Sequence, residues 1–217
     1  MKSKFLFCLL ILLNCCVTYG FTQDPKATAI LNEVTKVYTA ATTIEANFTL
    51  QIENKAQGIK ETKRGKISQK GKKFSVDLGK QKLLCDGKKT YTHLVDLKEL
   101  QINDYEADNQ DDISPSNFFS FYKKGFSYTY GGEKRVNGRK LQLINLIPNN
   151  KKKNYNKVEL FVNKRNQVET AMIFDKNGSK YTIAVSNVVT NKPIDDKIFV
   201  FDKKKYPGVE VTDLSSE

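Results

Sequence analysis

Histidine is almost absent from the 217-residue sequence, and this scarcity narrows the chemistry that the chain can perform. The single histidine, His93, lies in a run of strand character and has no metal-ligating residues at ligand spacing around it. The sequence contains no nucleophile elbow, phosphate-binding loop or metalloprotease motif. The carboxylate pair Asp195–Asp196 is of a kind common in loops. We therefore expect no enzymatic activity, no metal centre and no cofactor.

Long apolar runs are absent too, and the one run near the start is about half as long as a membrane span. Two lysines precede this run (residues 5–13), and Gly20 offers a small residue at a cleavage site. This order of charge, apolar core and small residue is typical of a secretory signal peptide. We expect residues 1–20 to be removed and residues 21–217 to form a single domain.

Cysteine is rare after the predicted leader. Cys8, Cys15 and Cys16 lie within the leader, so only Cys85 remains and no internal disulfide can form. Cys85 precedes a tight turn without a base nearby in sequence, and we interpret it as a small apolar strand residue. Lipidation at Cys15 or Cys16 is an alternative to cleavage, but Asn14 precedes Cys15 where a small residue is normal.

Acidic residues are outnumbered by basic ones, 24 to 36, and the formal net charge is +12. Such a balance is typical of nucleic-acid binding, but export argues against a nucleic-acid partner. The lysines occur in scattered pairs and triplets where turns are expected, such as 151–153 and 203–205. We interpret them as solvated loop ends. The alternative is docking on anionic lipid headgroups or on an acidic partner.

One amphipathic helix is predicted at the start of the mature chain. Asp24 is a suitable N-cap, and Pro25 suits the first helical position. Apolar residues then recur at helical spacing and form one stripe, which we expect to face the core. The stripe comprises Ala27, Ile30, Leu31, Val34, Val37, Tyr38 and Ala41.

The pattern then changes to strict alternation, which predicts a strand over 44–54 with one apolar and one polar face. Further strands are expected near 59–69, 72–78, 81–86, 89–95, 98–104, 126–131, 134–147, 155–163, 167–175 and 179–189. Turns suited to positive φ separate several of them, at Asp86–Gly87, Gly131–Gly132, Asn137–Gly138 and Asn177–Gly178. These roughly eleven strands predict one long antiparallel meander, which should curl around an interior.

A second helical piece is predicted over 114–122, with Ser114 as its cap and Gly125 at its end. Its aromatic residues favour a lid or plug over the interior, and an ordinary aromatic core segment is the alternative. The preceding acidic segment, 105–112, is a candidate cation site, but it lacks the glycine and the spacing of a calcium loop.

The order of these motifs resembles the LolA-type outer-membrane lipoprotein carrier proteins over about 190 residues of the chain. The resemblance rests on the strand at Ile44–Phe48, the hairpin Asp86–Lys88 before Tyr91, the segment Ser114–Phe119, the run Leu143–Pro148, and the ending Ile198–Phe201 followed by Tyr206–Val211. It implies an unclosed antiparallel β-barrel of about eleven strands, with helices covering an apolar cavity.

The resemblance also implies a periplasmic chaperone for acylated lipoproteins. Such a carrier receives its cargo from an inner-membrane lipoprotein-releasing ABC transporter and passes it to an outer-membrane receptor or to the outer membrane itself. A three-chain anchor cannot cross water unaided, because each buried methylene contributes about 0.8 kcal/mol. We expect a monomer.

If the apolar face of the first strand faced water, it would form an exposed hydrophobic patch that favours aggregation. We therefore expect this face, together with residues of neighbouring elements, to line the lipid cavity. The predicted lipid-binding residues are Ile44, Ala46, Phe48, Leu50, Ile52, Phe74, Val76, Tyr91, Phe118, Phe119 and Phe121.

The chain departs from the family where an arginine on the third strand often latches the lid. The matching stretch, 68–74, has lysines instead, and a lysine cannot reproduce the bidentate hydrogen bonding of arginine. Three other functions are open on sequence alone. These are a carrier of another lipid or amphiphile, a periplasmic sensor with the same fold, and a hydrolase of envelope lipids, which the missing catalytic residues disfavour.

Overall fold

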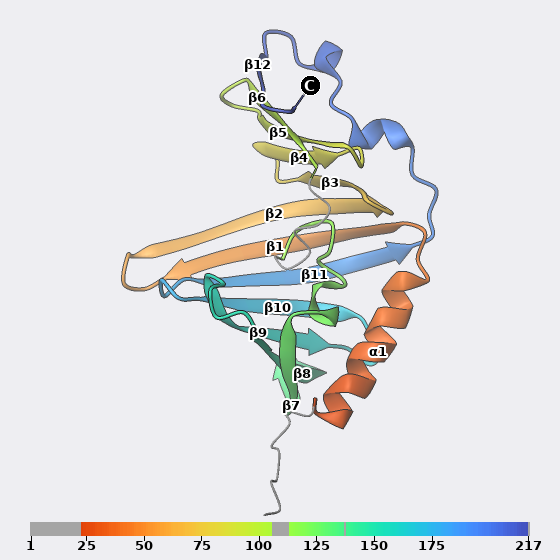
Figure 1. The fold of residues 1–217 in the computed structure, drawn as a ribbon, viewed down its shortest axis with the longest axis vertical. Helices are drawn as coiled ribbons and strands as arrows, with labels where there is room; N and C mark the ends of the chain where they lie inside the picture. Colours follow the sequence, from red (N-terminus) through yellow and green to blue (C-terminus); the bar gives the residue numbers. More distant parts are fainter. Residues whose placement is uncertain (1–22, 106–112, 137, 217) are drawn as a thin grey trace, which may run out of the picture.

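The computed structural model describes residues 23–105, 113–136 and 138–216, which form one twisted sheet with a helix, α1 (Pro25–Thr39), against it (Figure 1). The sheet strands are β1 (Ile44–Asn54), β2 (Ile59–Lys70), β3 (Lys73–Asp77), β4 (Gln81–Cys85), β5 (Lys89–Leu94), β6 (Glu99–Asp104), β7 (Phe126–Val136), β8 (Arg139–Pro148), β9 (Tyr155–Val162), β10 (Val168–Asp175), β11 (Lys180–Thr190) and β12 (Glu210–Asp213). The predicted signal peptide and Cys8, Cys15 and Cys16 lie outside the described residues.

The twelve strands have the order β12-β6-β5-β4-β3-β2-β1-β11-β10-β9-β8-β7, so β12 and β7 are the two edges and the sheet does not close. All neighbours are antiparallel except β12 and β6. This confirms the predicted unclosed antiparallel architecture. The prediction of one long meander is wrong, because β1 to β6 and β7 to β11 are two meanders joined by the antiparallel pair of β1 and β11.

The prediction of a turn at Gly131–Gly132 is also wrong, since both glycines lie inside β7. The register of β7 against β8 shifts between Tyr130 and Glu133, which marks a β-bulge. A Cβ on Gly131 would lie 2.6 Å from Leu143 Cγ, so only glycine fits there. The predicted strands 126–131 and 134–147 are therefore β7 and β8.

The start of α1 matches its prediction. The Asp24 carboxylate accepts hydrogen bonds from Lys26 N (2.9 Å) and Ala27 N (3.1 Å), as an N-cap does. Its second oxygen accepts from Tyr130 N on the edge strand β7, at 2.9 Å. These backbone hydrogen bonds, that from Tyr130 first, lower the pKa of Asp24. One side chain thus begins the helix and attaches it to the sheet.

Residues 113–125, called the lid segment below, cross the sheet in front of β1 and β11 (green in Figure 1). The predicted helix over 114–122 is not formed, because the segment consists of turns followed by a single 3-10 turn, η1 (Phe121–Lys123). The Asn117 side chain accepts from Ser114 N at 2.8 Å, and the Ser114 hydroxyl pairs with that of Ser116. These local bonds favour turns over a helix.

After β11 the chain runs along the outside of the sheet to the edge strand β12 (blue in Figure 1), through the 3-10 turns η2 (Asp196–Phe199) and η3 (Lys203–Lys205). Phe199 is fully buried on this path. Among the described residues, no helix is both long and apolar enough to cross a membrane.

Candidate functional site

An apolar cavity of about 280 Å³ lies between the lid segment and the inner face of the sheet. Its walls come from β1, β2, β4, β10, β11, the end of β3 and the lid segment. The lining residues are Phe48, Leu50, Ile67, Val76, Leu78, Gln81, Leu83, Ile113, Ser114, Pro115, Phe118, Phe119, Ile173, Ile183 and Val185. With two polar side chains among fifteen, this cavity suits hydrocarbon rather than a polar ligand.

The ring of Phe48 has space in this wall because Gly65 pairs with it across β1 and β2. A Cβ on Gly65 would lie 2.7 Å from Phe48 Cζ and 2.6 Å from the carbonyl oxygen of Asp77. Any larger residue at this position would therefore collide with both the aromatic ring and the neighbouring strand.

The structure brings five of the predicted lipid-binding residues together around the cavity: Phe48, Leu50, Val76, Phe118 and Phe119. Their contact with a lipid stays a prediction.

The other six predicted residues lie elsewhere. Ile44 and Ala46 are buried in the main core, and Ile52 is half-buried away from the cavity. Phe74 and Phe121 line a neighbouring pocket. Tyr91 donates to Asp86 Oδ2 at 2.9 Å beside the β4–β5 turn.

Sequence reasoning missed eight apolar lining residues: Ile67, Leu78, Leu83, Ile113, Pro115, Ile173, Ile183 and Val185. Ile183 and Val185 are large apolar residues two positions apart on β11, with the smaller Thr182, Ala184 and Ser186 between and beside them, and this alternation was a usable signal. Their place in the wall depends on the pairing of β11 with β1, where Leu50 lies opposite Ile183 and Phe48 opposite Val185.

The lid segment is held by hydrogen bonds to α1 and β2 and by four buried aromatic rings, those of Phe118, Phe119, Phe121 and Tyr122. The Phe119 ring stacks on Tyr38 of α1 with centroids 4.4 Å apart. The Tyr122 hydroxyl lies 3.3 Å from that of Thr35 on the same helix. On the sheet side, Gln69 Nε2 donates to the carbonyl oxygen of Ser116 at 2.7 Å. This last bond links the end of β2 to the middle of the lid segment.

Two lysines of the stretch 68–74, where the resemblance implies an arginine that latches the lid, pair with the C-terminal segment instead. Lys70 Nζ and Lys73 Nζ each lie 2.7 Å from a carboxylate oxygen of Asp196 in η2. These two hydrogen bonds lower the pKa of Asp196 to about 2. The lysines thus bind the C-terminal segment, while Gln69, which the sequence reasoning overlooked, makes the bond to the lid.

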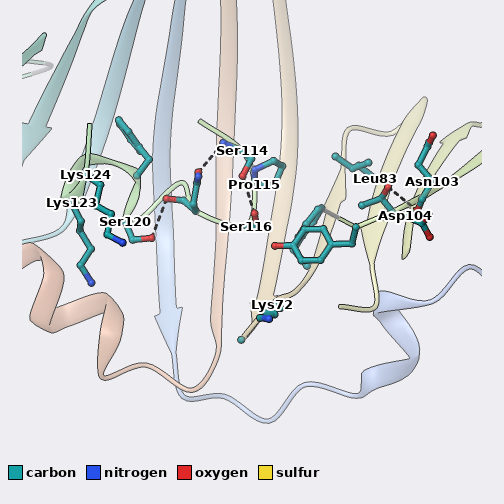
Figure 2. A pocket seen from close by; sticks show the side chains of 16 residues that line it. Lys72, Leu83, Asn103, Asp104, Ser114, Pro115, Ser116, Ser120, Lys123 and Lys124 are labelled. Atoms are coloured by element: carbon teal, nitrogen blue, oxygen red, sulfur yellow. Dashed lines mark hydrogen bonds between the residues drawn. The ribbon is translucent and has the colours of Figure 1, made fainter. Parts of the chain in front are cut away.

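A second, larger pocket of about 820 Å³ adjoins the apolar cavity on the other side of Ser114 and Pro115, and is shown in Figure 2. The two spaces share Leu83, Ser114 and Pro115 in their walls. Hydroxyl, amide and lysine side chains dominate the second pocket. Its residues are Gly71, Lys72, Phe74, Leu83, Thr90, Asn103, Asp104, Tyr105, Ser114, Pro115, Ser116, Asn117, Ser120, Phe121, Lys123 and Lys124.

His93 is 2% exposed and packs between two aromatic rings of the C-terminal segment, Phe201 at 5.0 Å and Tyr206 at 4.4 Å. Burial, followed by the nearby charge of Lys82, lowers the pKa of His93. Its position is that of a core residue. Residues 106–112 of the acidic segment, where a cation site was considered, lie outside the described residues.

Cys85 is a fully buried free thiol whose Sγ accepts a hydrogen bond from Gly87 N at 3.3 Å. Burial is the main cause that raises the pKa of this thiol, so it stays protonated and unreactive near neutral pH. We expect Cys85→Ser to lower the free energy of unfolding by about 1–2 kcal/mol and to leave the affinity for a fluorescent fatty-acid probe unchanged. Denaturant unfolding and probe titration measure both. Lost probe binding at unchanged stability would give Cys85 a functional role.

The sequence profile described as outer membrane lipoprotein carrier protein LolA matches residues 39–202. Among solved structures, an uncharacterised conserved protein of Thermus thermophilus is 14% identical with a TM-score of 0.56, over 87% of this chain and 99% of that one. It has the same fold.

Two further solved structures are more distant. Lipoprotein LppX of Mycobacterium tuberculosis is 12% identical with a TM-score of 0.49, over 80% of this chain and 99% of that one. A LolA superfamily protein of Nitrosomonas europaea is 14% identical with a TM-score of 0.42, over 82% of this chain and 98% of that one. No curated protein sequence matches the chain.

Proposed function

Because the chain belongs to the LolA family of outer membrane lipoprotein carrier proteins, we propose that it is a periplasmic carrier of lipoproteins. It would bind their acyl chains in the apolar cavity and transfer them from the inner membrane to the outer membrane. The observation that carries this proposal is an apolar cavity between the sheet and the lid segment, which crosses the sheet without being part of it.

The size of the cavity indicates how loading would occur. Three long acyl chains, at roughly 30 Å³ for each methylene group, take up far more space than the cavity of about 280 Å³ provides. Three chains therefore need a wider space. The lid segment would swing outward to provide it, because the sheet keeps its ladder of hydrogen bonds in that movement. The segment would give up the contacts of its four buried aromatic rings, Phe118, Phe119, Phe121 and Tyr122, and the acyl chains would replace them.

The partners follow from the same proposal. An inner-membrane lipoprotein-releasing ABC transporter would load the carrier, and an outer-membrane receptor or the outer membrane itself would accept the cargo. Release then needs only an acceptor with higher affinity, so the carrier itself needs no energy source.

Residues 1–20 would be a signal peptide that is removed on export. The mature chain would be a monomer and would catalyse no reaction. Intact mass of the exported protein tests the cleavage, and a diacylglycerol adduct at Cys15 or Cys16 would contradict it.

Native mass spectrometry on protein purified from its own envelope tests the cargo. A bound triacylated peptide supports a lipoprotein carrier. Bound free lipid without any acylated peptide would contradict this cargo and favour a carrier of another amphiphile.

The hydrogen bond from Gln69 to Ser116 leads to a testable prediction about the lid segment. Gln69→Leu keeps the side-chain size but removes the donor to Ser116 O. A neutral hydrogen bond contributes about 0.5–1.5 kcal/mol, so its loss shifts the population toward the open lid and should raise fatty-acid probe affinity roughly two- to tenfold. Fluorescence titration measures this. Gln51→Leu, at an exposed position of β1, is the control and should have no effect. Unchanged affinity in Gln69→Leu would mean that this bond does not restrain the lid.

A further inference from the structure

The polar pocket lies directly beside the apolar cavity, with the lid segment as their common wall. Figure 2 shows Lys123 and Lys124 on one side of Ser114–Ser116, and Asn103 and Asp104 on the other. An amphiphile has the same two-part chemistry, with apolar chains joined to a polar head. A molecule with its chains in the cavity could therefore place its head in the pocket.

The described side chains of this pocket carry an excess of positive charge. Lys72, Lys123 and Lys124 line it and are exposed, and none of the three has an ion-pair partner within the described part of the chain. Elsewhere many lysines do pair with carboxylates, as Lys70 and Lys73 do with Asp196. Three ammonium groups that have no ion-pair partner among the described residues, all around one pocket, favour an anion.

The one described carboxylate in the wall, Asp104, is already engaged. It accepts hydrogen bonds from the backbone nitrogen of Ser216, at 2.8 Å, and from the Ser216 hydroxyl. These bonds are the main cause that lowers the pKa of Asp104. Asp104 therefore stabilises the C-terminal end of the chain and is not paired with the pocket lysines.

Hydroxyl groups also lie in the wall of the pocket, on Ser114, Ser116, Ser120 and Thr90. Ser120 and Thr90 donate to the carbonyl oxygens of Asn117 and Asn103, and the Ser114 and Ser116 hydroxyls share one hydrogen bond, so these hydroxyls would have to turn toward a ligand in order to donate to it. A phosphate ester has several strong acceptor oxygens and is bound by such mixtures of lysine and hydroxyl donors.

We propose that this pocket binds the phosphate-bearing head of an anionic glycerophospholipid whose acyl chains occupy the apolar cavity. The chain would thus carry an anionic phospholipid as well as a lipoprotein. The inference rests on the proposed role of the apolar cavity in holding acyl chains. It assigns Lys72, Lys123 and Lys124 to headgroup selection.

The test compares two lipids with the same chains, dioctanoyl phosphatidylglycerol and dioctanoyl phosphatidylcholine, titrated as monomers by calorimetry. The parent protein should bind phosphatidylglycerol roughly tenfold more tightly at low ionic strength, because each lysine near an anionic head adds attraction. This preference should shrink in high salt, which screens exposed charges. The triple variant Lys72→Gln/Lys123→Gln/Lys124→Gln should lose the preference and keep its phosphatidylcholine affinity.

The matched control, Lys55→Gln/Lys60→Gln/Lys152→Gln, removes the same charge at exposed positions outside the pocket and should keep the preference. Equal affinity for the two lipids, or a preference that survives in the pocket variant, would overturn the headgroup site and leave the carrier proposal standing. Failure to bind either lipid would overturn both. Glycerol phosphate should bind far more weakly than the lipid; equal binding would indicate a site for free phosphate esters and overturn the lipid assignment.

Discussion

Phe119→Ala should lower the free energy of unfolding by about 2–4 kcal/mol and strongly weaken binding of a fluorescent fatty-acid probe. Phe119 is 3% exposed, stacks on Tyr38 at 4.4 Å and meets Phe118 edge to face at 5.1 Å. It therefore attaches the lid segment to α1 and lines the cavity at the same time. Loss of a buried Phe side chain from a packed core costs about 3–5 kcal/mol, and the adjoining cavity should reduce this cost because part of the ring already lacks packing partners.

Phe48→Ala separates the cavity wall from the lid attachment. Phe48 is only half-buried and lines the same cavity. Phe48→Ala should therefore lower the free energy of unfolding by only about 1–2 kcal/mol, which is less than the loss expected for Phe119→Ala. It should still weaken probe binding, because it removes apolar contact area. Ile144→Ala is the matched control, since Ile144 is fully buried in the main core and lines neither cavity described above. Its loss should cost about 2–5 kcal/mol without changing probe affinity.

Denaturant unfolding and probe titration on the three variants distinguish a lipid cavity from a filled core. If Phe48→Ala and Phe119→Ala were both as destabilising as Ile144→Ala, and the parent protein bound no probe, the interior would be a packed core. The carrier proposal would then be wrong.

The sequence predicted features that depend on local periodicity. Alternation over Ile44–Ile52 gave the inward face of β1, and Asp24–Pro25 gave the start of α1, because each signal involves neighbouring residues. The edge strand β12 was missed because all four of its residues are exposed, so no apolar alternation marks it. Its place depends on parallel pairing with β6, about 110 residues earlier in the chain.

The remaining errors also concern contacts between distant residues. The pairing of β1 with β11 joins two meanders and places Ile183 and Val185 in the cavity wall, and nothing local in the sequence signals that pairing. The Gly131–Gly132 pair has the composition of a hairpin turn, but it lies at a bulge of β7, where Gly131 packs closely against the Leu143 side chain on β8. The single Gln69 bond to Ser116 has no sequence motif at all.

Gly65→Ala should have the second large effect, with a loss of about 1–3 kcal/mol of stability and a clear loss of probe affinity. The added Cβ would lie 2.6 Å from Asp77 O, a backbone atom of β3, and 2.7 Å from Phe48 Cζ. The backbone of β3 cannot retreat without weakening its pairing with β2, where Lys66 lies opposite Asp77. The Phe48 ring lines the cavity, and if the added methyl group displaced it into that space it would occupy room for the probe.

A double-mutant cycle between Gly65→Ala and Phe48→Ala measures this coupling. Once the ring is absent, one of the two collisions disappears, so Gly65→Ala should cost less in the Phe48→Ala protein than in the parent, by at least about 0.5 kcal/mol. The collision with Asp77 O remains, so some cost should persist. Additive effects would show that the Phe48 ring does not rest against Gly65, and this part of the cavity wall would then need another arrangement.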